Sequence, residues 1–140
     1  MLEEVWVRDC MTRDVVTCAL DTTLEEVVHE LQSNLFSCLV VEDSHQPVGI
    51  ITERDLVRIF SQLLDDDRWR KFNVENYMTA NPRTLYEDLT LMEAVDHMRI
   101  DKIRQAPVVD SQQQLVGILT QTDVINGFYR AGLPITNKNY

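Results

Sequence analysis

The hydrophobic and polar positions of this chain run through the same order twice. In each half a short apolar segment comes first. Apolar residues then recur three and four positions apart, which predicts a helix with one buried face. Two apolar segments on either side of a polar turn predict a pair of strands, and an amphipathic segment predicts a closing helix. Each half is therefore predicted to fold in the order β-α-β-β-α.

Local signals give the boundaries of these elements. The first helix of each half opens at a capping box, Thr23-x-x-Glu26 and Thr90-x-x-Glu93, in which side chains satisfy the free backbone N–H groups. Its buried face carries Leu24, Val27, Val28, Leu31 and Leu35 in one half and Leu91, Ala94, Val95 and Met98 in the other. The expected strands are 15–17, 39–42, 48–52, 83–85, 107–110 and 116–120, and the expected last helices are 55–64 and 123–129.

The two halves also match residue by residue. Met11-Thr12 and Met78-Thr79 lie 67 positions apart, and the segments 48–55 and 116–123 lie 68 positions apart. The second half thus holds one additional residue between its first helix and its first long strand. This many identities in the same order indicate an internal duplication.

The duplication predicts how the chain is organised. A three-stranded sheet with two helices on one face leaves its other face exposed, and pairing two such sheets buries that face. We therefore expect one α/β (α+β) module over 1–140, with repeats at about 7–64 and 74–129 packed sheet to sheet about a pseudo-two-fold axis. Residues 65–73 contain neither Gly nor Pro, which favours an ordered crossover pinned by Trp69 and Phe72, whereas 130–140 are expected to fray.

Composition narrows the function classes. A formal net charge of −10 opposes the binding of nucleic acid or an anionic membrane surface. No run of about 18 apolar residues is present, and the acidic N-terminus fits neither a secretory signal nor a transit peptide. The three cysteines form no CxxC pair, which indicates reduced thiols and a cytoplasmic protein. No metal site is expected, because His29, His45 and His97 fall on exposed helix faces and in a turn.

The segments VGIITERD (48–55), VGILTQTD (116–123) and APVVD (106–110) resemble the CBS domain family, named after cystathionine β-synthase. Two such motifs in tandem are similar to a CBS pair, or Bateman module, over residues 7–129. The resemblance implies a homodimeric module that binds AMP, ADP, ATP, S-adenosylmethionine or NAD in clefts between the repeats and regulates an enzyme, channel or transporter. Leu39 stands where the family favours Pro, and together with Phe36 it is expected to narrow the cleft that both line.

The last helix of each half begins with Thr-x-x-Asp, for which two interpretations are open. Thr52 with Asp55, and Thr120 with Asp123, have the spacing of a capping box that serves only to start the helix. The resemblance implies instead that each Asp accepts two vicinal ribose hydroxyls. The two roles are compatible, because the Thr can cap while the Asp faces outward.

Further candidates lie on the strands. Arg104 and Gln105 stand where the resemblance implies contacts to nucleotide phosphates, and an ordinary surface charge is the alternative for Arg104. Ser37 and Cys38 occupy the matching positions of the first half and carry no charge, so the two sites are expected to differ in their preference for phosphorylated ligands. The resemblance also implies base contacts from Thr17, Thr84 and Ala106, for which a place in the core is the alternative.

The sequence therefore predicts a ligand-sensing regulatory module that needs no cofactor and is not an enzyme. Neither a GxxxxGK[ST] loop nor a nucleophile with its base occurs. The apolar residues of the last helices exceed what a small core is expected to need, which predicts a symmetric dimer interface. These are Leu56, Ile59, Phe60, Leu63, Val124, Ile125 and Phe128. The alternative function is a dimerisation or docking module without a nucleotide ligand.

Overall fold

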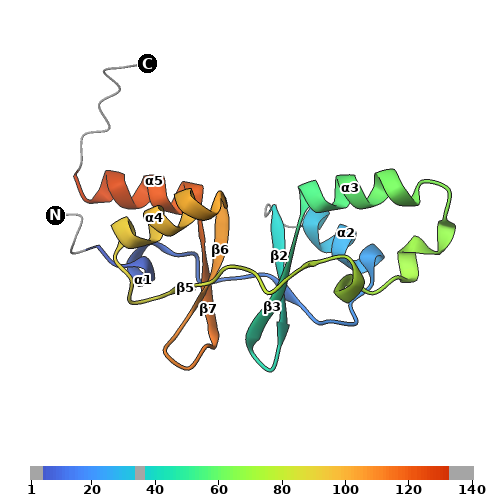
Figure 1. The fold of residues 1–140 in the computed structure, drawn as a ribbon, viewed down its shortest axis with the longest axis horizontal. Coiled ribbons are helices and arrows are strands. Elements are labelled where there is room, and N and C mark those ends of the chain that lie inside the picture. The colour runs from blue at the N-terminus through green and yellow to red at the C-terminus, as the bar shows by residue number, and fades with distance from the viewer. Residues whose placement is uncertain (1–4, 34–36, 133–140) are drawn as a thin grey trace, which may run out of the picture. The chain divides into compact units, whose positions relative to one another are not determined.

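The computed structural model describes residues 5–33 and 37–132, which form two compact units (Figure 1). The first unit is Val15–Pro82, and the second combines the described residues of Met1–Asp14 and Arg83–Tyr140. The boundaries of the two compact units therefore differ from the boundaries of the two sequence repeats. The start of the first repeat packs in the second unit, and the start of the second repeat packs in the first unit.

The first unit is built on a four-stranded sheet in the order β1-β2-β3-β4. Its strands are β1 (Thr17–Cys18), β2 (Cys38–Asp43), β3 (Gln46–Thr52) and β4 (Thr79–Ala80), and its helices are α2 (Leu24–Ser33), α3 (Glu53–Leu63) and the 3₁₀ turns η2 (Asp67–Lys71) and η3 (Val74–Asn76). Strand β1 is parallel to β2, whereas β2–β3 and β3–β4 are antiparallel. The predicted order β-α-β-β-α is confirmed, and β4 is an addition that the sequence did not predict.

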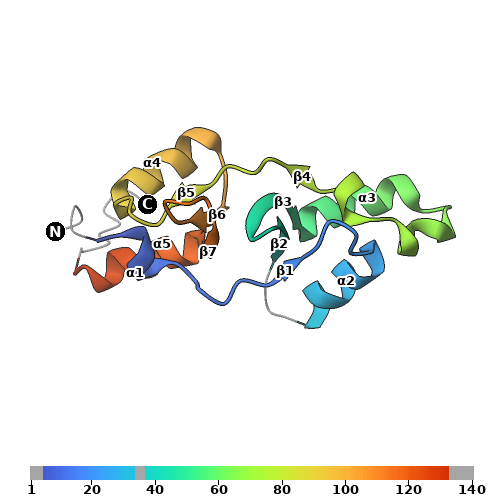
Figure 2. The ribbon, with the colours of Figure 1, turned by 90° about the horizontal axis from the view of Figure 1, so that it is seen from below.

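The second unit repeats this plan around a three-stranded sheet in the order β5-β6-β7. Its strands are β5 (Leu85–Tyr86), β6 (Gln105–Val109) and β7 (Leu115–Thr120), and its helices are α1 (Val7–Cys10), α4 (Leu91–Asp101) and α5 (Gln121–Arg130). Thr12 forms an isolated antiparallel bridge with Ile118, which corresponds to the pairing of Thr79 with Ile50 in the first unit. The blue α1 lies beside the orange and red elements in both views (Figures 1 and 2).

The helix starts follow the predicted capping boxes. Thr23 N–H donates to Glu26 Oε2 at 3.0 Å, and Glu26 N–H donates to Thr23 Oγ1 at 3.2 Å. Thr90 and Glu93 make the same reciprocal pair at the start of α4. The short strands β1 and β5 begin about two residues later than predicted, because pairing with their parallel partners starts only at Thr17 and Leu85. The predicted helical residue Leu35 lies outside the described residues.

The start of each repeat packs in the unit of the other repeat, and a methionine that contacts a glycine anchors each of these exchanged segments. A Cβ on Gly117 would lie 2.7 Å from the Sδ of Met11 and 2.9 Å from the carbonyl oxygen of Thr12. A Cβ on Gly49 would overlap the sulfur of Met78 in the same way. Glycine therefore lets Met11 and Met78 pack directly on β7 and β3, and at Gly117 the Thr12 backbone leaves no room for a Cβ.

The crossover between the repeats is ordered, as the absence of Gly and Pro predicts. Trp69 meets Phe60 edge to face with ring centroids 4.9 Å apart, and Phe72 stacks on Tyr77 at 5.9 Å. The crossover also reaches the core, because Val74 in η3 is fully buried among the residues of the first unit. The prediction that Trp69 and Phe72 pin this segment is confirmed.

Candidate functional site

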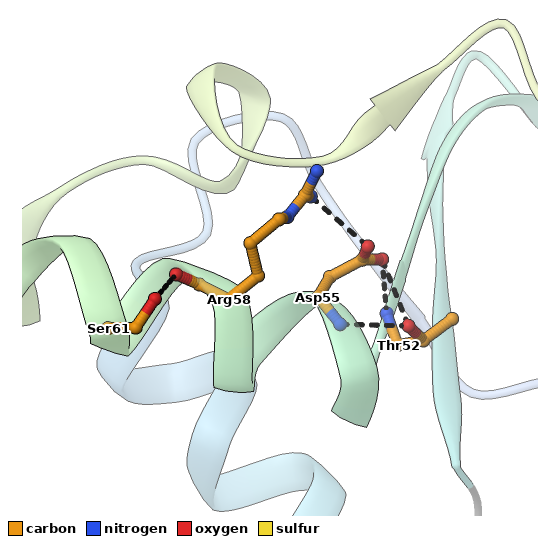
Figure 3. Close-up of polar contacts among 4 residues, drawn as sticks. All are labelled: Thr52, Asp55, Arg58 and Ser61. Carbon is orange, nitrogen blue, oxygen red and sulfur yellow. Dashed lines mark hydrogen bonds and ion pairs between the residues drawn. The ribbon is translucent and has the colours of Figure 1, made fainter.

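Thr52 and Asp55 form a complete capping box at the start of α3 (Figure 3). Asp55 N–H donates to Thr52 Oγ1 at 3.1 Å, and Asp55 Oδ2 accepts from Thr52 N–H at 2.9 Å and from its hydroxyl at 3.0 Å. The other oxygen, Oδ1, lies 3.2 Å from Arg58 Nη2, one turn along the helix. The capping interpretation is therefore confirmed at this position, and the carboxylate carries an ion pair in addition.

Thr120 and Asp123 form the matching capping box at the start of α5. Asp123 N–H donates to Thr120 Oγ1 at 3.2 Å, and Thr120 N–H donates to Asp123 Oδ2 at 3.0 Å. The outer partner differs from that of Asp55, because the hydroxyl of Thr12 lies 3.1 Å from Oδ1 and 3.2 Å from Oδ2. Among the described residues, no Lys or Arg forms an ion pair with Asp123.

Both carboxylates remain partly open to solvent. The Asp55 side chain is 18% exposed, and Asp123 is likewise half-buried in its unit. A half-buried carboxylate at a helix N-terminus is held in a fixed direction by the backbone yet can still accept hydrogen bonds from outside. Chemically, each position is suited to accept hydrogen bonds from a ligand that offers hydroxyl or amine donors.

In the first unit the sheet brings Ser37 and Cys38 next to Thr52. Cys38 pairs with Thr52 across β2 and β3, and Glu53 N–H donates to the Ser37 carbonyl at 2.9 Å. The Ser37 residue is exposed, whereas Cys38 is buried. Thr17 lies opposite Val40, two residues along β2, and its hydroxyl is 3.3 Å from Glu42 Oε1. Ser37 is therefore the predicted residue that lies open beside the Thr52–Asp55 pair.

In the second unit the same register joins Gln105 to Thr120. These residues pair across β6 and β7, and Gln121 N–H donates to the Arg104 carbonyl at 3.0 Å. Ala106 is fully buried in the core, so its side chain offers no open surface. Thr84 is half-buried and directly precedes β5.

Arg104 is exposed and lines a cavity of about 590 Å³ between α4 and α5. Arg99 and Lys102 add two further cations to this cavity, and its apolar side is formed by Val95, Met98, Ile103, Val124 and Ile125. The α5 residues that line it share a helix face with Gln121. Because successive residues turn by about 100° in a helix, Asp123 lies on the opposite face of α5. The structure thus does not bring the Arg104 cavity and the Asp123 carboxylate to the same side of the helix.

Leu39 does not narrow a cleft in this structure. Its side chain is 1% exposed and packs in the core of the first unit with residues such as Leu24 and Ile51. The strand therefore turns this position inward, and the expectation for Leu39 is wrong. Its proposed companion Phe36 lies outside the described residues.

The cysteines are unpaired thiols in unreactive surroundings. Burial raises the pKa of Cys18 and of Cys38 to about 11, and burial also raises the pKa of Cys10. Residues 5–33 and 37–132 group no three His, Cys, Asp or Glu side chains in a way that would hold a metal ion. None of the helices in these ranges combines the length and apolar character needed to cross a membrane.

Comparison with known proteins gives the family of the chain. The model of the CBS domain matches twice, at residues 7–62 and 74–130. The chain belongs to the CBS domain family. This CBS pair is 32% identical to a CBS domain-containing protein of Dictyostelium discoideum, a match that covers 88% of the chain and 90% of that protein.

Other relatives are longer than this CBS pair. An uncharacterized protein of Methanopyrus kandleri is 32% identical, and the match covers 89% of the chain but 63% of that protein. An inosine-5′-monophosphate dehydrogenase of Methanocaldococcus jannaschii is 30% identical over 84% of the chain, which amounts to 22% of the enzyme. The matched region is thus a minor part of that enzyme.

Solved structures share the fold, and several of them hold adenosine compounds. The CBS domain pair of protein MJ0100, in complex with 5′-methylthioadenosine and S-adenosyl-L-methionine, is 28% identical with a TM-score of 0.76, over 89% of this chain and 99% of that one. A CBS domain protein from Pyrobaculum aerophilum complexed with AMP is 26% identical with a TM-score of 0.75, over 85% and 89% of the two chains.

Thr12 and Arg58 are contacts of the candidate carboxylates that the sequence did not predict. The match between Thr12 and Thr79 was visible as part of the repeat, but nothing local indicates that Thr12 reaches a helix 111 positions away. Arg58 carried a signal that could have been used, because it follows Asp55 by three positions on a helix. These two residues give the otherwise matching sites different surroundings.

Proposed function

We propose that this CBS pair is a regulatory module that binds an adenosine-containing ligand, with Asp55 and Asp123 accepting the ribose hydroxyls. The supporting observation is that each repeat holds a half-buried carboxylate at the first turn of its last helix. Relatives of the same fold are known in complex with AMP and with 5′-methylthioadenosine and S-adenosyl-L-methionine. The ribose diol common to these compounds is a donor pair that matches a carboxylate.

The residues beside each Thr-x-x-Asp pair bear on whether the ligand carries a phosphate. Next to Asp55, the open residue Ser37 is uncharged, whereas Arg104 and Gln105 stand at the matching place of the second unit. Thr17 and Thr84 remain candidates for contact with the base. The Asp123 site is therefore proposed to prefer a phosphorylated ligand, although Arg104 would have to turn from the cavity between α4 and α5 to reach it.

A thermal-shift panel tests the binding of adenosine compounds. AMP, ADP, ATP, S-adenosylmethionine and NAD would be tested against the wild type, Asp55→Asn, Asp123→Asn and, as a matched control, Asp96→Asn on the exposed side of α4. A ligand at one hundred times its Kd stabilises the folded state by about 2.7 kcal/mol. Stabilisation should be reduced in Asp55→Asn and in Asp123→Asn, lost when the two substitutions are combined, and kept in the control. No stabilisation by any compound would favour a docking module without a ligand.

We further propose that the module acts on a partner as a homodimer in the cytoplasm and catalyses nothing itself. Leu56 and Ile59, for which the sequence predicts a place in an interface, are buried in the core of their own unit. Large apolar side chains that are exposed on the helices are Val57, Met92, Ile100, Ile125 and Tyr129. Such residues are available for an interface or for the target enzyme or transporter. Light scattering that gives the monomer mass at high concentration would contradict the dimer.

A further inference from the structure

The hydrogen bonds already made by Asp123 leave room for a diol. A carboxylate has about four lone-pair sites for hydrogen bonds. Asp123 accepts from Thr120 N–H at 3.0 Å and from one hydroxyl, that of Thr12, which is shared between both oxygens at 3.1 and 3.2 Å. Both donors are neutral, and because the Thr12 hydroxyl has a single hydrogen that can point to one oxygen only, two acceptor sites can be freed for a vicinal diol.

Asp55 is more heavily engaged. It accepts from the N–H and the hydroxyl of Thr52 and from Arg58, which makes three donors on the two oxygens (Figure 3). One acceptor site remains, so a diol can bind only after one of these donors leaves. Thr52 belongs to the cap of α3, whereas the Arg58 side chain is 61% exposed in an ion pair of the kind that contributes little stability. Arg58 is therefore the donor that a ligand would displace.

The repeat supplies the counterpart of each residue. Asn126 takes the place of Arg58 in α5, 68 positions along the chain, and Thr79 takes the place of Thr12. The first unit thus offsets the charge of its carboxylate with a guanidinium, and the second unit leaves its carboxylate with neutral donors. This difference arises from two positions within an otherwise matching motif.

We propose that Arg58 is a specificity-determining residue that makes the two carboxylates unequal. Asp123 takes a ribose diol as it stands, and Asp55 takes one only when Arg58 moves away. The inference rests on the proposed function, because it assumes that these carboxylates bind ribose. It predicts that the Asp123 site fills first and discriminates strongly between ribose and 2′-deoxyribose, whereas the Asp55 site discriminates weakly.

The test is the ratio of the Kd values for 2′-deoxyAMP and AMP, measured by calorimetry on the full chain. Both probes carry the same phosphate, so any contact of Arg58 with phosphate cancels in the ratio. Asp55→Asn isolates the Asp123 site, where the ratio should be about ten, the value of one hydrogen bond to a charged group. Asp123→Asn isolates the Asp55 site, where the ratio should be near one.

Two further variants decide whether Arg58 is the cause. Added to Asp123→Asn, Arg58→Gln should raise the ratio toward about ten. Added to Asp55→Asn, Asn126→Arg should lower it toward one, and the exposed Arg54→Gln is the matched control that should change neither. Equal ratios at the two sites, or ratios that Arg58→Gln and Asn126→Arg leave unchanged, would overturn the inference. A wild type that binds none of the adenosine compounds of the thermal-shift panel would instead refute the proposed function itself.

Discussion

The hydroxyl of Thr12 bridges both oxygens of Asp123, at 3.1 and 3.2 Å, although the two residues are 111 positions apart. The backbone holds Thr12 in place, because its N–H and carbonyl each pair with Ile118 at 2.9 Å. The start of the chain is thereby tied to the first turn of α5. The carboxylate proposed to bind the ligand is therefore the same group that holds this N-terminal segment to α5.

Replacing Thr12 with Val should remove the hydrogen bond to Asp123 while keeping the shape of the side chain. The loss of one hydrogen bond to a carboxylate is expected to lower the free energy of unfolding by about 1.5 kcal/mol, measured by urea denaturation. Thr12→Ser should restore most of it. Thr79→Val is the matched control in β4, where the residue is exposed, and an equal loss there would show that the bond to Asp123 is not the cause.

Adding a methyl group to the close-packed glycines should destabilise the units. Gly117→Ala places a Cβ against Met11 and the Thr12 carbonyl, and a cost of about 1–3 kcal/mol is expected for such overpacking. Gly49→Ala should behave similarly against Met78. A double-mutant cycle of Gly49→Ala with Met78→Ala measures the coupling, because the smaller side chain makes room. Strictly additive effects would argue against the contact.

The buried thiols give stability an alkaline dependence. Burial raises the pKa of Cys18 and Cys38 to about 11 in the folded state from an ordinary value of 9.0, which the unfolded chain retains. Above pH 9.0 the unfolded chain loses thiol protons that the folded chain keeps, so the free energy of unfolding should fall between pH 9 and 11 and be unaffected by these groups below pH 9. Cys18→Ala with Cys38→Ala should flatten this decline in denaturation curves, and an unchanged slope would exclude the thiols.

The capping box of α4 should contribute measurably to the free energy of unfolding, although it lies at the surface. Thr90→Ala removes the acceptor of Glu93 N–H, which the structure gives at 3.2 Å, and a loss of about 1 kcal/mol is expected. Thr122→Ala, on the exposed first turn of α5, is the control and should change the midpoint of thermal unfolding little. A comparable shift for both variants would mean that helix propensity rather than the cap is responsible.

The order of elements was predictable because it depends on local patterns. The period of apolar residues, the capping boxes at Thr23 and Thr90, and the motif at 48–55 each report on a few neighbouring residues, and all appear in the structure. The aromatic residues of the crossover were also identifiable, because Trp69 and Phe72 are large apolar side chains in a polar segment.

The exchange of segments was not predictable in the same way. A two-residue strand such as β4 has no periodicity of its own, and its pairing with β3 depends on Met78 meeting Gly49. The inward turn of Leu39 likewise depends on which face of β2 the core occupies. At the candidate site, Thr52 and Asp55 were found from spacing, whereas Thr12 needed the tertiary structure.

The exchange has a practical consequence for dissecting the molecule. A fragment cut at the repeat boundaries, such as 7–64, would lack Val74 and β4. Core residues that pack on Val74 and the edge of β3 that pairs with β4 would then be exposed to water. The contiguous stretch 15–82 instead retains every partner of its sheet and core. Autonomous folding is therefore to be sought in a piece whose ends do not follow the repeat boundaries, and a protease would have to cut near both residue 14 and residue 82 to release it.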